Sequence, residues 1–182
     1  MLISGAGTNL QTLIDAPDID VACVVSSRAE AAGLDRARQA AIPALATVDD
    51  DEATAFLEEH EVGLVVLAGY MRILSPAFVH RYSGRILNVH PSLLPAFPGA
   101  DAVQDAIDHG VKLTGVTVHL VDERNPAVDS GPIVLQEALA VSYDDTLADV
   151  IERLHRIEHR LLPEAVRLYR AGRIQVDGRR VR

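Results

Sequence analysis

Short, mostly apolar runs recur through the first half of the chain, and segments with helical patterns separate them. The strands expected from these runs are Leu2–Ser4, Asp20–Ser26, Gly63–Ala68 and Ile86–His90. The helices expected between them are Asn9–Ala16, Ala31–Ala41, Asp50–His60 and Ser75–Tyr82, with Pro76 at the first position of the last helix. Continuous apolar strands are typical of a parallel sheet covered on both faces, and strand–helix alternation predicts a doubly wound α/β fold.

The second half of the chain departs from this alternation. Thr114–Leu120 and Ile133–Ala140 are expected strands joined by an irregular loop, and they predict an antiparallel addition to the sheet. Thr146–Arg170 has apolar residues on one stripe at helical spacing, which predicts a long C-terminal helix. Pro163 is expected to kink or divide that helix, because proline removes a backbone hydrogen bond. The tail Arg173–Arg182 is basic and short.

Length and composition narrow the class of protein. The 182 residues predict one domain, residues 1–182. No apolar run approaches the roughly 18 residues of a membrane helix, and nothing near Met1 resembles a signal peptide, so we expect a cytoplasmic protein without membrane partners. The formal charge of −9 disfavours nucleic acid. Cys23 is expected to be an inert core thiol, and without a Cys/His cluster at zinc spacing we expect no metal.

A glycine-rich segment, Ser4–Asn9, joins the first expected strand to the first expected helix. Such a turn presents backbone N–H groups at the positive end of a helix dipole, which favours phosphate. Thr8 can cap the helix and also donate to an anion. The segment is not a dinucleotide fingerprint, because Leu10 stands where a third glycine is needed. The alternative is a tight turn that holds no ligand.

The segment Leu87–Pro95 is the most informative one for chemistry. Asn88 and His90 are two apart on an expected strand, so both side chains leave the same face, at the end where open α/β sheets bind ligands. An amide can donate to an oxyanion, and an imidazole can donate a proton or stabilise negative charge at neutral pH. The alternative is a hydrogen-bonded strand end without a function, which the prolines that follow make less favourable.

Two further side chains are candidates for the same site. Asp129 ends the irregular loop, where a carboxylate facing His90 would orient the imidazole and could accept the proton of an amine. Arg72 follows the buried run Gly63–Ala68, where it could hold a ligand carboxylate with two hydrogen bonds. The alternatives are a turn residue for Asp129 and a solvated arginine for Arg72.

Four motifs together resemble one family, the phosphoribosylglycinamide formyltransferases of purine biosynthesis: SGAGTNLQ, LAGYMRILSP, LNVHPSLLPAFPG and VDSGPI. They occur in the family's order over nearly the whole chain. The resemblance implies a Rossmann-like domain with 10-formyltetrahydrofolate as formyl donor and 5-phosphoribosylglycinamide as acceptor. We expect only small-molecule partners and a monomer or homodimer.

The resemblance also implies roles for particular residues. The family's catalytic amide, imidazole and carboxylate correspond to Asn88, His90 and Asp129. The turn that holds the substrate phosphate and ribose corresponds to Gly7, Thr8 and Asn9, and an acid that contacts the ribonucleotide corresponds to Glu158. The folate-contacting residues correspond to Asn88, Met71, Arg72, Ile73 and Leu74, with Arg72 near the glutamate tail of the folate.

The chain departs from the family's pattern in three places. Arg124–Ala127 lengthens the loop before Asp129, Asp101 stands where relatives commonly have histidine, and an arginine-bearing segment is missing around Thr47–Asp51. Three other functions stay open: a formyltetrahydrofolate hydrolase, a formyltransferase acting on methionyl-tRNA or nucleotide sugars, and a non-catalytic folate- or nucleotide-binding remnant. The hydrolases and tRNA enzymes usually carry a further domain, which we expect this chain to lack.

Overall fold

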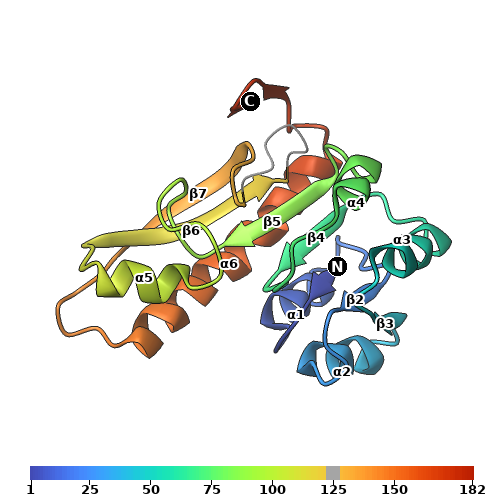
Figure 1. Cartoon of the computed structure of the whole chain (residues 1–182), viewed down its shortest axis with the longest axis horizontal. Coiled ribbons are helices and arrows are strands. Elements are labelled where there is room, and N and C mark those ends of the chain that lie inside the picture. The colour runs from blue at the N-terminus through green and yellow to red at the C-terminus, as the bar shows by residue number, and fades with distance from the viewer. Residues whose placement is uncertain (122–127) are drawn as a thin grey trace. The chain divides into compact units, whose positions relative to one another are not determined.

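The computed structural model describes residues 1–121 and 128–182 (Figure 1). The chain divides into two compact units, residues 1–88 and 89–182, and the expected single domain stays a prediction. Within the described part of the chain, no helix is both long enough and apolar enough to span a bilayer.

The first unit alternates strands and helices. Its elements are β1 (Leu2–Ile3), α1 (Thr8–Ile14), β2 (Val24–Ser26), α2 (Ala32–Gln39), β3 (Ala44–Ala46), α3 (Asp50–Glu59), β4 (Val65–Ala68), α4 (Pro76–Arg81) and β5 (Ile86–His90). The division between the units falls within β5, after Asn88. The pairs β1–β2, β1–β4 and β2–β3 are parallel. Every residue of β1, β2 and β4 is buried, so both faces of these strands are covered, as their apolar runs predict.

Two details of this unit follow from local chemistry. Ser75 caps α4 by accepting the N–H of Phe78, and Pro76 occupies the first helical position, as predicted. Strand β3 was not predicted. Its apolar run Ala-Leu-Ala is only three residues long, is only partly covered and has low β-propensity, so the sequence does not mark it as a strand. The strand forms by its parallel pairing with β2.

The second unit starts with the end of β5. It continues with α5 (Ala102–Asp108), β6 (Leu113–Leu120), β7 (Ile133–Ala140), α6 (Leu147–Arg170), β8 (Val176–Asp177) and β9 (Arg180–Val181). Strands β6 and β7 pair antiparallel along their length, with a register shift between Val118 and His119. Helix α5 and the β8–β9 hairpin were not predicted, because both are too short to show a clear hydrophobic period.

Helix α6 is a single element of 24 residues, so the expectation that Pro163 divides it is wrong. Pro163 is itself buried, and its neighbours Leu161, Leu162 and Ala165 are buried as well. Burial of this apolar face outweighs the one backbone hydrogen bond that proline removes. A capping box of Thr146 and Asp149 begins the helix.

Strands β1 to β7 belong to one sheet. Their order is β3-β2-β1-β4-β5-β6-β7, and β8 and β9 form a separate two-stranded sheet. The predicted fold class is therefore confirmed: a mainly parallel α/β sheet with an antiparallel addition and a long C-terminal helix.

Candidate active site

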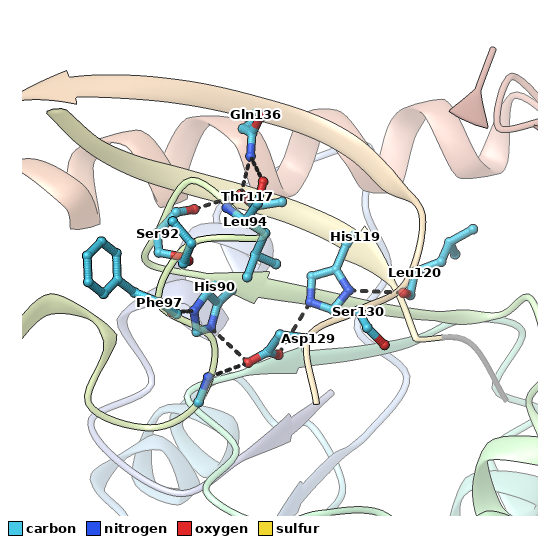
Figure 2. Close-up of polar contacts among 12 residues, drawn as sticks. His90, Ser92, Leu94, Phe97, Thr117, His119, Leu120, Asp129, Ser130 and Gln136 are labelled. Atoms are coloured by element: carbon cyan, nitrogen blue, oxygen red, sulfur yellow. Dashed lines mark hydrogen bonds and ion pairs between the residues drawn. The ribbon is translucent and has the colours of Figure 1, made fainter. Parts of the chain in front are cut away.

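The imidazole of His90 and the carboxylate of Asp129 face each other in the second unit (Figure 2). His90 Nδ1 lies 3.4 Å from Asp129 Oδ2, and the two side chains are only 6% and 10% exposed. His90 ends β5, and Asp129 lies in a turn with a left-handed φ of 55°. The predicted juxtaposition of these two side chains is thus present in the structure. The lengthened segment at Arg124–Ala127 lies outside the described residues.

A second imidazole contacts the same carboxylate. His119 Nε2 lies 3.5 Å from Asp129 Oδ1, and the His119 side chain is 2% exposed. Its other ring nitrogen, Nδ1, lies 2.9 Å from the carbonyl oxygen of Leu120. This residue was not predicted from the sequence. A histidine in an otherwise apolar strand is the signal that could have identified it, because a buried imidazole needs polar partners.

Two backbone groups fix the orientation of the pair. His90 Nε2 donates to the carbonyl oxygen of Phe97 at 2.8 Å, since a carbonyl can only accept. The N–H of Gly99 donates to Asp129 Oδ2 at 2.9 Å. With one proton on Nε2, Nδ1 carries a proton only in the imidazolium form, which can donate to both Phe97 and Asp129.

The charge of Asp129 follows from its surroundings. Burial alone would raise the pKa of this carboxyl group. Hydrogen bonds from His119 and from the Gly99 N–H, together with the charges of His90 and His119, outweigh burial and hold the pKa below its usual value of 3.8. Asp129 is therefore ionised at neutral pH and can accept a proton.

Asn88 lies two residues before His90 in β5, so the predicted strand is confirmed and the two side chains leave the same face. Asn88 is half-buried and already makes a polar contact. Its amide can donate to a developing oxyanion, as the sequence analysis expects.

The glycine-rich turn belongs to the first unit. Gly7 caps α1 with a left-handed φ of 70°, and no side chain caps the helix. The prediction that Thr8 is the cap is therefore wrong, because the turn at Gly7 starts the helix one residue earlier and Thr8 is already helical. A Cβ on Gly7 would lie 2.6 Å from the Cα of Gly33. Both the left-handed φ and this close contact therefore require glycine at position 7. Asn9 is buried.

The guanidinium group of Arg36 and the hydroxyl of Ser4 form hydrogen bonds at this turn. Arg36 on α2 donates from Nε to the carbonyl oxygen of Ala6 at 2.8 Å and from Nη1 to Gln11 Oε1 at 3.2 Å. The hydroxyl of Ser4 bonds the hydroxyl of Ser27 at 2.6 Å and accepts the N–H of Met71 at 2.8 Å. These contacts hold the segments after β1, β2 and β4 together within the unit. Arg36 was not predicted from the sequence.

The four residues of the expected folate stretch differ in burial. Met71 and Ile73 are 65% and 80% exposed. Arg72 is also exposed and interacts with the hydroxyl of Tyr70, whose pKa is raised, mainly by burial. Leu74 is instead part of the core. Three of the four side chains are thus available to a ligand.

Glu158 lies on α6 and is 6% exposed, which is rare for a carboxylate. It makes a polar contact and is followed by His159, whose ring stacks on that of His155. Among residues 1–121 and 128–182, no group of three His, Cys, Asp or Glu side chains is arranged to hold a metal ion.

Comparison with known proteins gives the class of the fold and site. Residues 1–166 match the formyl transferase family. The chain is 42% identical to the phosphoribosylglycinamide formyltransferase of Haemophilus influenzae, over 97% of this chain and 88% of that protein. It therefore belongs to the phosphoribosylglycinamide formyltransferase family.

Two further relatives show how much of this chain, and of each relative, the similarity covers. The crystal structure of glycinamide ribonucleotide transformylase 1 from Symbiobacterium toebii is 46% identical, with a TM-score of 0.94, over 100% of this chain and 91% of that one. The human trifunctional purine biosynthetic protein adenosine-3 is 44% identical over 97% of this chain. The chain spans only 18% of the length of that human protein.

Proposed function

We propose that the chain transfers a formyl group from 10-formyltetrahydrofolate to the amine of 5-phosphoribosylglycinamide, a step in purine biosynthesis. The observation that carries this proposal is the ionised carboxylate of Asp129 held 3.4 Å from the buried imidazole of His90. A binding remnant would not need a buried acid–imidazole pair, because burying charged groups costs free energy. The names of the relatives that the chain matches over most of their length support the same reaction.

The proposed chemistry is direct transfer. The substrate amine attacks the formyl carbon and forms a tetrahedral intermediate, whose oxyanion accepts hydrogen bonds from Asn88 and from protonated His90. Asp129 accepts the proton that the amine loses, and the folate N10 takes up a proton as it leaves. In the structure His90 already donates to Phe97 and faces Asp129, so a bound oxyanion takes the place of one of these acceptors.

The residues proposed to bind the two substrates come from both units. Gly7, Thr8 and Asn9 present the backbone N–H groups for the substrate phosphate and ribose, and Arg36 adds positive charge beside that turn. Glu158 contacts the ribonucleotide. Met71 and Ile73, with Leu74 behind them, contact the folate ring system, Asn88 contacts the formyl end, and Arg72 holds the glutamate tail. We further propose that the protein is cytoplasmic and acts as a monomer or homodimer, without a metal, nucleic acid or membrane.

One experiment separates this function from its alternatives. The protein is mixed with 10-formyltetrahydrofolate, with and without the ribonucleotide, and folate absorbance and formate are followed together. Transfer requires that deformylation depend on the amine and release no formate. Formate release without the amine would instead identify a hydrolase, and no deformylation in either mixture would leave a binding remnant.

A further inference from the structure

One face of β6 carries three residues that contact the candidate site or the loop beside it. Gly115, Thr117 and His119 alternate along the strand and so lie on the same face. Thr117 and His119 are 0% and 2% exposed, in a strand that is otherwise mostly apolar. His119 faces Asp129, whereas Gly115 and Thr117 contact the segment that follows His90 in the chain. This segment, residues 91–99, is called the His90 loop below.

The buried hydroxyl of Thr117 is the centre of a hydrogen-bond cluster (Figure 2). It donates to the carbonyl oxygen of Ser92 at 2.7 Å and accepts the N–H of Leu94 at 3.2 Å. Gln136 on β7 donates from Nε2 to the same hydroxyl at 2.9 Å and to the carbonyl oxygen of Leu94 at 3.0 Å. A hydroxyl has one donor and two acceptor positions, so all three are used. Both N–H groups of the Gln136 amide are used as well.

Gly115 lets the His90 loop approach the strand. A Cβ at this position would lie 2.6 Å from Cδ2 of Leu93 and 2.1 Å from the carbonyl oxygen of Glu137. Leu93 therefore packs directly on the backbone of β6, which only glycine permits. Together with the bonds from Thr117, this contact attaches three consecutive loop residues, 92–94, to a single strand face.

The same loop supplies the two backbone groups that orient the acid–imidazole pair. The carbonyl of Phe97 accepts from His90, and the N–H of Gly99 donates to Asp129. Phe97 has a left-handed φ of 50°, a conformation that a non-glycine residue keeps only where its surroundings impose it. The hydroxyl of Ser92 continues the connection by donating to the carbonyl of Ala96 at 2.6 Å. A continuous chain of contacts thus runs from Thr117 to His90 and Asp129.

We propose that Thr117, assisted by Gln136, is a positioning residue that holds the His90 loop so that Phe97 and Gly99 orient His90 and Asp129. This inference rests on the proposed function, because it assigns Thr117 a part in the same formyl transfer. Thr117 makes its described hydrogen bonds to the loop and to Gln136, and it acts on catalysis only through the loop. The required feature is the hydroxyl and not the size of the side chain.

The test compares three variants: the two Thr→Val changes keep the shape of the side chain, whereas Thr117→Ser removes its methyl group. Thr117→Val removes the hydroxyl, and Thr117→Ser keeps it. Thr114→Val is the matched control, since Thr114 lies on the same strand, is 3% exposed, and its hydroxyl has no hydrogen-bond partner among the described residues. We expect Thr117→Val to lower kcat by up to about 10²-fold, the effect of a misplacement of roughly 1 Å, with KM for both substrates nearly unchanged. Thr117→Ser should restore kcat, and Thr114→Val should leave it unchanged.

A second readout does not depend on turnover. Imidazole ¹⁵N spectra of each variant report the hydrogen bond of His90 Nε2, with the His90 signal assigned by its loss in His90→Gln. We expect the signal to move in Thr117→Val and to stay in Thr117→Ser and Thr114→Val. The inference is overturned if the His90 signal and kcat are both unchanged in Thr117→Val. It is also overturned if Thr114→Val loses as much activity as Thr117→Val, which would indicate a general loss of structure.

Two other results can be told apart from these: a Thr117→Val variant that does not fold, and a wild-type protein that transfers no formyl group. If Thr117→Val does not fold, Gln136→Leu removes two of the hydrogen bonds at a more exposed position, and a smaller change in kcat and in the His90 signal is expected. An unchanged signal in that folded variant would contradict the inference. If the wild-type protein transfers no formyl group, the proposed function fails, whereas the ¹⁵N spectra still decide whether Thr117 orients His90.

Discussion

Nε2 of His119 lies 3.5 Å from Oδ1 of Asp129, while the other carboxylate oxygen, Oδ2, faces His90. The acid of the candidate site is thus held between two buried imidazoles. Each imidazole has its second nitrogen on a backbone carbonyl, that of Phe97 for His90 and that of Leu120 for His119. This arrangement makes the carboxylate the shared partner of the two imidazoles.

Replacement of His90 by alanine should lower kcat by about 10²–10⁴-fold, because the site loses both a donor to the oxyanion and the charge beside Asp129. The measurement is steady-state turnover with both substrates. His60→Ala is the matched control, since His60 is a partly exposed histidine of the first unit that bonds the carbonyl of Phe56. Turnover of His90→Ala close to that of the wild type would rule out the proposed role.

Replacement of His119 by phenylalanine should shift the acid limb of the pH–rate profile to higher pH. The hydrogen bond from His119 helps to lower the pKa of Asp129, so its removal raises that pKa and protonates the carboxylate sooner as the pH falls. At neutral pH, kcat should fall less than in Asp129→Asn. An acid limb that does not move would show that His119 serves only packing.

Asp129→Asn should change how stability depends on pH. The folded-state pKa of Asp129 is depressed, so its contribution to stability is present above the unfolded-state pKa of 3.8 and is lost as the pH falls through the folded value. The difference in unfolding free energy between wild type and variant should therefore stay constant from pH 7 to about pH 5 and shrink as the pH falls further. Urea unfolding of both proteins across this range measures it, and a difference that also stays constant in the more acid part would contradict the depressed pKa.

Gly7→Ala should destabilise the protein by at least about 1–2 kcal/mol, because alanine is strained at a φ of 70° and its Cβ would lie 2.6 Å from the Cα of Gly33. KM for the ribonucleotide should also rise as the turn moves. Gly5→Ala is the control in the same turn, since a Cβ there meets no atom within 4 Å. Equal unfolding free energies for the two variants would disprove the close packing of Gly7 on Gly33.

Much of the fold could be predicted from the sequence, because the residue pattern within a long element indicates whether it is a helix or a strand. Strands β5 and β7 begin and end at the predicted residues, because each is a run of mainly apolar residues. Four of the five residues of β5 are buried, whereas β7 is only partly covered. Strand β3 and helix α5 were missed, because three and seven residues carry too little pattern. Thr8 was assigned as a cap from its residue type, whereas the left-handed turn at Gly7 decides where α1 begins.

The sequence by itself determined the chemical groups of the candidate site and the strand end that carries two of them, Asn88 and His90. A motif specifies residue types at fixed spacing along one strand, and the alternation of strand side chains then sets their common face. Only the tertiary structure decided that His119 joins Asp129 and that Thr117 holds the His90 loop. These contacts connect residues 10 and 25 positions apart in the chain, so their formation depends on strand pairing and loop packing, which no local pattern encodes.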